Sequence, residues 1–211
     1  MDLRNVGAVL LDMDGTLVDS DAAVDRAWTV WAIEHGIEPA AAQAIAPGST
    51  SARTVHRLLP ELGAAALAVA AARQLELQYD DLADVTPAVG AHELLAVLAR
   101  LGTSWAVVTS ADTRLARARL GAAGVSVPVL ITADECTRSK PDPQGYLQAA
   151  QRLGVDPGRC LVVEDSEAGL AAGRAAGAMT AALRHLTGDL CLDDLGQLAR
   201  LLAESAQEAV R

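Results

Sequence analysis

Asp12 and Asp14 are separated by one residue and follow an apolar run, residues 6–11. Such a run predicts a buried parallel strand that ends at the edge of a sheet, where open α/β sheets bind ligands. On an extended segment the carboxylates of residues i and i+2 project to the same side, and two like charges so close together are stabilised by a cation. The pair therefore predicts a Mg²⁺ site.

Three later stretches add groups suited to the same chemistry. Thr109 and Ser110 bring two hydroxyls to the end of a predicted strand, and Glu164 and Asp165 bring two adjacent acids to the end of another. Carboxylate oxygens are ligands that Mg²⁺ accepts. Lys140 precedes a helix that begins with proline, and it is the only lysine in a chain whose other basic residues are arginines. Because Lys and Arg are not interchangeable at a tight site, this indicates a need for a compact ammonium group.

The elements that must position these groups alternate along most of the chain. Apolar runs predict strands, and helical spacing stopped by glycine predicts helices between them. Alternation of apolar strands with helices predicts an α/β fold with a doubly wound parallel sheet. The predicted strands are residues 105–109, 127–132, 159–164 and 179–183, and the predicted helices are residues 88–101, 112–123, 143–153, 167–176 and 193–209.

A purely helical block interrupts this alternation directly after the first strand. Helical patterns cover residues 21–36, 39–46, 50–62 and 64–83, with no strand signal among them. Trp28 and Trp31 are three residues apart on one helix face, which predicts a packed helical core. We expect a Rossmann-like core of residues 1–17 and 86–211, with a helical cap domain inserted as residues 18–85.

Composition limits the possible functions. The chain has 211 residues, a net charge of −10 and a pI near 4.7, which argues against a nucleic-acid or anionic-membrane surface. The start of the chain lacks a basic and then apolar leader, and the longest Ala/Val/Leu run, residues 64–72, is too short to span a bilayer. Cys136, Cys160 and Cys191 have no metal-ligand spacing. These features predict a cytoplasmic enzyme, a monomer or weak homo-oligomer, without nucleic-acid or membrane partners.

In this order, the four stretches around Asp12, Thr109, Lys140 and Asp165 resemble the four motifs of the haloacid dehalogenase superfamily, and the insertion resembles that superfamily's helical cap. The resemblance implies that Asp12 is a nucleophile forming an aspartyl-phosphate and that Asp14 is the general acid/base. It implies that Mg²⁺ is held by Asp165, with help from Glu164, by the Asp12 carboxylate and by the Asp14 backbone carbonyl.

The same resemblance assigns substrate contacts. Thr109, with Ser110 beside it, matches the hydroxyl position that holds the phosphoryl oxygens, and Lys140 matches the lysine that pairs with Asp12 and the phosphate. Asp12, Glu164, Asp165 and a phosphate dianion together carry a charge of about −5, against about +3 from Mg²⁺ and Lys140. The remaining positive charge is expected from backbone N–H groups or from a cap arginine.

Several reactions use this set of residues. Asp14 favours phosphoryl transfer over dehalogenation, and a cap without lysine argues against a phosphonatase. A β-phosphoglucomutase-like mutase is the alternative, although such enzymes tend to carry Val at the position of Thr16 and to use a cap lysine. A protein that only binds a phosphorylated ligand is a further alternative.

The prediction for the substrate is a small phosphorylated metabolite. Residues 24–28 and 105–110 resemble the small sugar-phosphate phosphatases, while phosphoglycolate or a glycerol phosphate fits the same core. Specificity in a capped enzyme depends on the cap. Arg53, His56 and Arg57 are the predicted cap contacts to the substrate. Mg²⁺-dependent hydrolysis of a sugar phosphate is therefore the expected activity.

Overall fold

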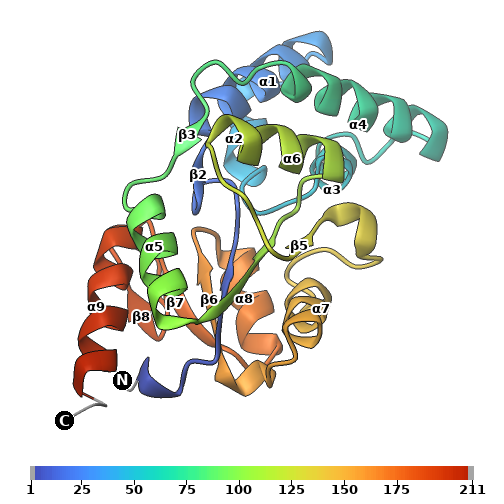
Figure 1. Cartoon of the computed structure of the whole chain (residues 1–211). Helices are drawn as coiled ribbons and strands as arrows, with labels where there is room; N and C mark the ends of the chain where they lie inside the picture. Colours follow the sequence, from blue (N-terminus) through green and yellow to red (C-terminus); the bar gives the residue numbers. More distant parts are fainter. Residues whose placement is uncertain (1–2, 209–211) are drawn as a thin grey trace.

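A six-stranded parallel sheet forms the centre of the computed structural model, which describes residues 3–208 (Figure 1). The strands are arranged in the order β5-β4-β1-β6-β7-β8. Their bounds are β1 Ala8–Leu11, β4 Ser104–Val108, β5 Leu130–Ile131, β6 Cys160–Glu164, β7 Met179–Ala182 and β8 Leu190–Cys191. The doubly wound α/β fold predicted from the sequence is confirmed.

Strand β1 marks the point where the chain reverses its direction of travel across the sheet. From β1 the chain moves to β4 and β5 on one side, and it then returns to β6 on the other side and continues to β7. Leu11 is in register with Val107 of β4 and with Val163 of β6. Loops after β1 and β6 therefore diverge, and the crevice between them is where a sheet of this kind binds ligands.

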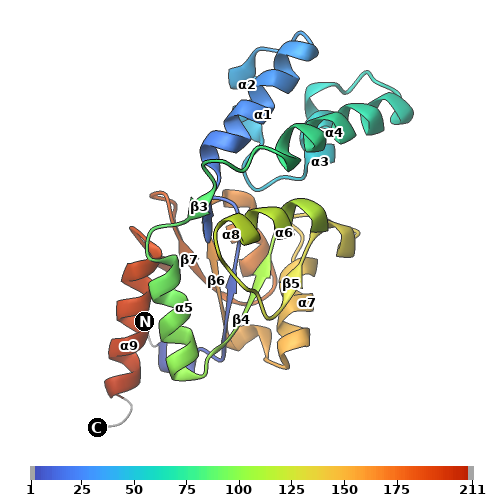
Figure 2. The ribbon, with the colours of Figure 1, turned by 45° about the horizontal axis from the view of Figure 1, so that its top comes forward.

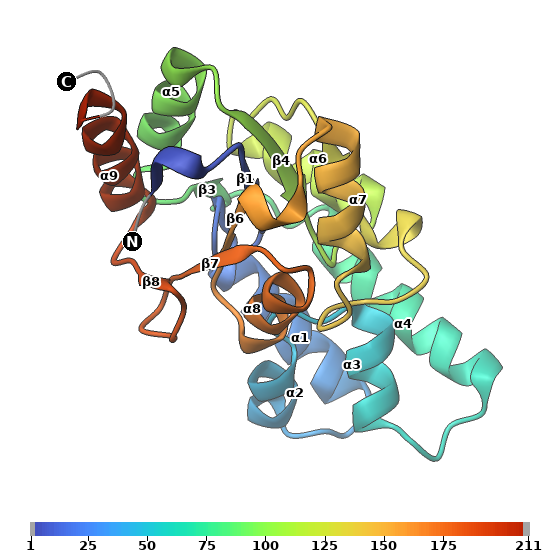
Figure 3. The ribbon, with the colours of Figure 1, turned by 90° about the horizontal axis from the view of Figure 1, so that it is seen from below.

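Helices cover both faces of the sheet. Helices α5 (Ala91–Leu101), α6 (Thr113–Ala122) and α9 (Leu195–Glu208) contribute to one buried cluster, and α7 (Gln144–Leu153) and α8 (Glu167–Ala175) contribute to the other. Alternate strand residues point to opposite faces. Accordingly, the clusters divide the strand residues between them, Val9 and Leu11 in one, Ala8 and Leu10 in the other. Figure 3 shows α5 and α9 side by side, away from α7.

Four helices lie beyond the carboxyl ends of the central strands (Figures 1 and 2). They are α1 Asp21–Glu34, α2 Pro39–Ile45, α3 Ser51–Leu58 and α4 Ala64–Tyr79. The chain enters and leaves them through an antiparallel pair of short strands, β2 (Val18–Asp19) and β3 (Thr86–Pro87). We call these four helices and their loops the cap. Pairing of β2 with β3 ties the two connections together at its base.

The cap has its own buried core. Trp28 and Trp31 pack edge to face with ring centroids 5.3 Å apart, and the indole N–H of Trp31 donates to the carbonyl oxygen of Ala70 at 2.8 Å. Both rings belong to one buried cluster with residues of α2, α3 and α4. Packing of the two tryptophans in a helical core is therefore confirmed, and it joins α1 to α4.

The structure differs from the sequence expectations mainly at element ends. Helix α3 ends at Leu58 because Pro60 restricts the residue before it and cannot continue a helix. Edge strand β5 covers only Leu130–Ile131, since Pro128 lacks a backbone donor. The two-residue strands β2, β3 and β8 were not predicted, because two residues carry no periodic pattern. The predicted end of the last helix, residue 209, lies outside the described residues.

Three short 3-10 helices complete the description: η1 Leu3–Asn5, η2 Ala133–Glu135 and η3 Pro157–Arg159. Within residues 3–208, none of the helices has both the length and the apolar character needed to cross a bilayer.

Candidate active site

Lys140 lies at the centre of a buried charged cluster where β1, β4 and β6 end. Its ammonium group donates to Asp12 Oδ1, to Glu164 Oε1 at 2.6 Å and to the backbone carbonyl oxygen of Val108 at 3.1 Å. These three acceptors use all the donors of an ammonium group. Burial lowers the pKa of Lys140, but the charges and hydrogen bonds of Asp12 and Glu164 together outweigh burial and raise it above its ordinary value. The lysine is therefore a fixed positive charge beside Asp12.

Glu164 is fully buried, and both of its carboxylate oxygens are bonded. Oε1 accepts from Lys140 and from the Tyr146 hydroxyl at 2.6 Å, and Oε2 accepts from the Ser166 hydroxyl at 2.9 Å and from the Ser166 backbone N–H at 3.3 Å. Gly169 makes room for this carboxylate, because a Cβ at Gly169 would lie 1.8 Å from the Glu164 carboxyl carbon. This arrangement differs from that of Asp12 and Asp165, since Glu164 is bonded to protein donors at each oxygen.

Asp12 and Asp165 have the electrostatic character of cation ligands. Burial and the neighbouring charge of Glu164 raise the pKa of Asp12 well above its ordinary range, although Lys140 acts against them. Burial and Glu164 likewise raise the pKa of Asp165 to about 7, against the opposing charges of Arg184 and Lys140. One oxygen from each of Asp12, Glu164 and Asp165 lies within 4.8 Å of the others. The cluster lacks positive charge in protein groups alone, and its oxygen donors fit a divalent metal ion.

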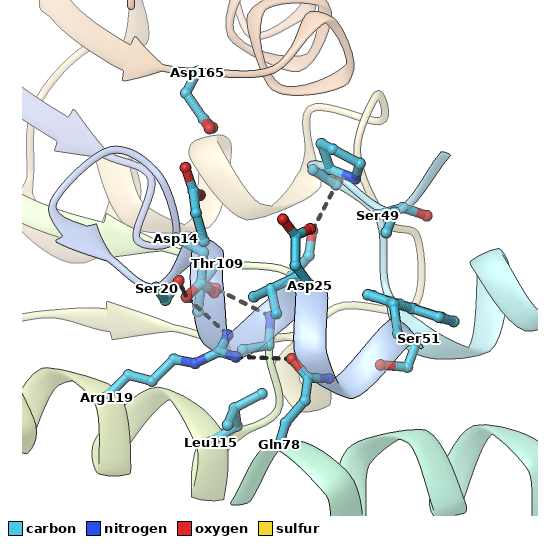
Figure 4. Close-up of a pocket in the computed structure, with 18 of the residues that line it drawn as sticks. Asp14, Ser20, Asp25, Ser49, Ser51, Gln78, Thr109, Leu115, Arg119 and Asp165 are labelled. Carbon is cyan, nitrogen blue, oxygen red and sulfur yellow. Dashed lines mark hydrogen bonds and ion pairs between the residues drawn. The ribbon is translucent and has the colours of Figure 1, made fainter. Parts of the chain in front are cut away.

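Asp14 has partners that the sequence did not predict. Its Oδ1 accepts from the Ser20 hydroxyl at 2.7 Å and from Arg119 Nη1 at 2.8 Å (Figure 4). Arg119 belongs to α6 and has only 2% of its side chain exposed. Helical spacing is the signal that could have found it, because Arg119 lies on the same face of α6 as the apolar residues that the helix buries, whereas Arg114 and Arg117 are exposed.

A second unpredicted arginine lies on the other side of the cluster. Arg184, in the loop after β7, pairs with Asp165 Oδ2 at 3.0 Å and donates to Asp21 Oδ1 at 2.7 Å. Its backbone has a φ of +54°, in the left-handed region where a side chain other than glycine is strained. Positive charge beyond Lys140 therefore comes from two arginines outside the cap, whereas the sequence led us to expect backbone N–H groups or a cap arginine.

Charges around the site come close to balance with one divalent cation. The carboxylates are Asp12, Asp14, Asp21, Glu164 and Asp165, and the cationic side chains in contact with them are Lys140, Arg119 and Arg184. The acids exceed the cations by two, which is the charge of one Mg²⁺. The same crowding of negative charge contributes to the raised pKa values of Asp12 and Asp165.

Thr109 and Ser110 follow β4, as predicted, and face the same cavity as Asp12 and Asp14. The Thr109 hydroxyl accepts from the backbone N–H of Ala111 at 3.0 Å, which fixes the turn after the strand. The Ser110 hydroxyl donates to the carbonyl oxygen of Gly48, in the loop between α2 and α3, at 3.1 Å. This bond holds a cap loop directly over the end of β4.

A cavity of about 210 Å³ lies between these groups and the cap. Its apolar wall includes Trp28, and hydrogen-bonding side chains of the cap complete it; these are Asp25, Gln43, Ser49, Ser51 and Gln78. Figure 4 shows Asp25, Ser49, Ser51 and Gln78 to the right of Asp14 and below it. The cap therefore encloses a small polar cavity next to the charged cluster.

The three predicted cap contacts do not line this cavity. Arg53, His56 and Arg57 are exposed residues of α3, and Arg53 Nη1 instead donates to the backbone carbonyl oxygen of Lys140. Their helix presents Ser51 to the cavity, one turn earlier. Arg53 thus connects the cap to the loop that carries Lys140.

A parallel sheet, a helical cap and a carboxylate–lysine cluster between them define a capped enzyme with a doubly wound α/β core. Residues 6–177 match the haloacid dehalogenase-like hydrolases, and the chain belongs to this family. It is 40% identical to hexitol phosphatase A of Escherichia coli over 169 residues, which cover 80% of this chain and 78% of that protein. It is 37% identical to N-acetylmuramic acid 6-phosphate phosphatase of Pseudomonas aeruginosa over 185 residues, 84% of this chain and 81% of that protein.

Among solved structures, β-phosphoglucomutase from Clostridium difficile has a TM-score of 0.85 to this chain, with 20% identity over 98% of this chain and all of that one. At this identity the likeness concerns the fold. It places the sheet and the helical cap in an arrangement already seen in an enzyme of known structure.

Proposed function

We propose that the protein is a Mg²⁺-dependent phosphatase that hydrolyses a small sugar phosphate or sugar-alcohol phosphate through an aspartyl-phosphate on Asp12. The observation that carries the proposal is the buried contact of Lys140 with Asp12, beside Asp14 and beneath a small polar cavity. Two relatives with names that specify phosphatases of phosphorylated sugar compounds support it. We also propose that the protein divides into a core domain of residues 1–17 and 86–211 and a cap domain of residues 18–85.

The proposed reaction has two displacements. The Asp12 carboxylate forms a bond to phosphorus as the bond to the sugar oxygen breaks, and Asp14 gives its proton to the leaving oxygen. Water then attacks the phosphorus of the aspartyl-phosphate, Asp14 takes the water proton, and the Asp12 carboxylate leaves. Thr109, Ser110 and Lys140 hold the phosphoryl oxygens in both steps. For this, Ser110 and Lys140 exchange the bonds that they make to the carbonyl oxygens of Gly48 and Val108.

Asp12 and Asp165, together with the Asp14 backbone carbonyl, would hold the Mg²⁺, which supplies positive charge that offsets repulsion between the carboxylates and the phosphate. Glu164 differs from them because protein donors already occupy its oxygens. We therefore assign Glu164 chiefly to the orientation of Lys140. From the sequence we expected Glu164 to help Asp165 bind the metal. The proposed set of metal ligands is therefore smaller by this one residue.

The cavity favours one substrate class. At about 210 Å³ it is smaller than the range of roughly 300–1,000 Å³ usual for ligand pockets, which suits a small molecule. Gln43, Ser49, Ser51 and Gln78 offer hydrogen bonds to hydroxyl groups, and Trp28 offers an apolar surface to a carbon chain or ring. Asp25 disfavours a second anionic group near the cap. A phosphorylated polyol fits these features better than phosphoglycolate or the bisphosphate that a mutase handles.

A panel of phosphate esters tests the proposal, with released inorganic phosphate as the readout. It includes hexose phosphates, hexitol phosphates, glycerol phosphate and phosphoglycolate, with Mg²⁺ present, and β-glucose 1-phosphate is also assayed for isomerisation. The polyol phosphates are expected to be the preferred substrates, and Asp12→Asn is expected to abolish their turnover. Asp25→Asn is the matched control, because it makes the same change outside the charged cluster and should act on substrate preference while phosphate release persists.

Near-normal turnover by Asp12→Asn on every ester would refute the mechanism. Isomerisation without hydrolysis would identify a mutase, and tight ligand binding without either activity would identify a binding protein. Action in the cytoplasm as a monomer or weak homo-oligomer stays a prediction from the sequence.

A further inference from the structure

Arg119 is a buried charge within an otherwise ordinary surface helix. Helix α6 exposes Arg114 and Arg117 but buries all except 2% of the Arg119 side chain. Removing a guanidinium from water costs several kcal/mol unless well-placed partners compensate. The position of this side chain is therefore decided by the groups that it contacts.

Those contacts come from two different parts of the fold. Arg119 Nη1 donates to Asp14 Oδ1 at 2.8 Å, and Nη2 donates to Gln78 Oε1, on cap helix α4, also at 2.8 Å (Figure 4). Arg119 Nε has no hydrogen-bond partner among residues 3–208. One planar group thus bonds at the same time to the proposed proton donor and to the cap.

Hydrogen bonds continue from Gln78 through the cap to the cavity wall. Gln78 Nε2 donates to Gln74 Oε1 at 2.6 Å, and the Ser51 hydroxyl donates to the same oxygen. Ser51, Gln78 and Arg119 all line the cavity. A connected polar path therefore runs from Ser51, which faces the space for a ligand, to Asp14.

We infer that Arg119 is a positioning residue that orients the Asp14 carboxylate, and that Gln78 makes this orientation depend on the docked cap. The inference rests on the proposed function for the role of Asp14. Among residues 3–208, Asp14 accepts from one other side chain, Ser20, at the same oxygen. When the cap moves away, the guanidinium loses the bond that fixes the position of Nη2, so its orientation toward Asp14 is held less tightly. Proton transfer is thereby favoured once the cap covers a ligand.

A double-mutant cycle distinguishes this role from a purely structural one. Arg119→Met is measured alone and in the Asp14→Asn background, with the exposed Arg117→Met as the matched control. Alone, Arg119→Met should lower kcat by about 10², within the range for a general acid–base group, with a much smaller change in KM. In the Asp14→Asn background it should lower kcat no further. Equal losses in both backgrounds would overturn the inference, because Arg119 would then act independently of Asp14.

Gln78→Leu tests the link to the cap without removing the buried charge. It should reproduce part of the kcat loss, and combining it with Arg119→Met should add little to Arg119→Met alone. Arg119→Lys should recover only part of the activity, since one ammonium cannot match both bonds of the planar fork. Additive effects of Gln78→Leu and Arg119→Met would overturn the link between the cap and Asp14.

Amide hydrogen exchange separates this inference from the proposed function. In Arg119→Met, exchange at the last turn of α4 should increase severalfold, while Arg117→Met should leave it unchanged. If the wild-type protein hydrolyses none of the esters, the proposed function fails, yet the exchange result still reports on the contact with the cap. Unchanged exchange in Arg119→Met would show that this contact does not hold the cap, and the inference would fail whichever reaction the protein catalyses.

Discussion

Gly169→Ala is expected to damage the active site by a single added methyl group. The new Cβ would lie 1.8 Å from the Glu164 carboxyl carbon and from Oε1, so the carboxylate must move. Moving it breaks the bonds to Lys140 and Tyr146 and leaves a buried charge poorly paired. Breaking a buried pair costs about 3–5 kcal/mol. The better helix propensity of alanine returns about 1 kcal/mol.

We therefore expect a net loss of roughly 2–4 kcal/mol in the free energy of unfolding, below the usual total of about 5–15 kcal/mol, so that the variant still folds. Turnover should fall further than stability suggests, because Lys140 loses an anchor and a misplacement of about 1 Å costs on the order of 10²-fold. Urea denaturation followed by tryptophan fluorescence gives the first quantity, and phosphate release from the preferred ester gives the second.

Gly121→Ala provides the matched control. Gly121 also lies within a helix, α6, but a Cβ there would meet no atom within 4 Å. This variant should be fully active and slightly stabilised, by no more than about 1 kcal/mol. If Gly169→Ala had the same stability and turnover as Gly121→Ala, Glu164 could not be the anchor of Lys140 that we describe.

Further predictions concern the cap, the lysine and the metal. Gly48→Ala should raise KM and lower kcat, because Gly48 has a φ of +68° and an added Cβ would lie 2.3 Å from the Ser166 hydroxyl. Unchanged KM and kcat in steady-state kinetics would show that the docked cap is not the active form. Lys140→Arg should lower kcat by orders of magnitude despite the conserved charge, and only a mild loss would contradict the need for an ammonium group. Asp165→Asn should greatly increase the Mg²⁺ concentration needed for half-maximal activity, whereas Glu164→Gln should mainly lower kcat; the reverse pattern in a Mg²⁺ titration would exchange their roles. Without metal, folded Asp165 keeps its proton up to a pKa of about 7 while the unfolded chain loses it near the ordinary value of 3.8, so its contribution to the free energy of unfolding should fall as pH rises between these values. Urea denaturation in EDTA across this range should show that fall in the wild type and a smaller fall in Asp165→Asn, in which the raised pKa of Asp12 still contributes.

Much of the fold could be predicted from local patterns. Apolar runs that end in polar residues located β1, β4 and β6, and helical spacing located the four cap helices, because burial on one face leaves a periodic trace in the sequence. The two-residue strands β2, β3 and β8 could not be predicted. Strand β8, for example, depends on pairing with β7. The observed ends of helices and strands differ from the predicted ends where a proline or a position at the edge of the sheet removes a hydrogen bond.

The candidate site divides in the same way. Asp12, Thr109 and Asp165 could be chosen from the sequence because each follows the end of a strand, where this kind of sheet binds ligands. Lys140 could be chosen because it is the only lysine and precedes a helix. Arg53, His56 and Arg57 looked equally suitable by type, yet they do not line the cavity. The packing of α3 on α4 decides which face of α3 is exposed. The spacing of residues in the sequence did not identify that face.

By itself, the sequence determined the parallel α/β sheet, the helical insertion and the opening pair of acids, whose positions follow from the alternation of apolar and polar residues. Only the tertiary structure decided which residues the acids of the site contact. Asp14 meets Arg119, which is 105 positions away, and Glu164 meets Tyr146, a residue that resembles any buried tyrosine of a helix. Local spacing can show that such a side chain is buried, but it does not show which residue it pairs with, because the pairing is selected by the cost of leaving a buried charge unpaired once the chain has folded.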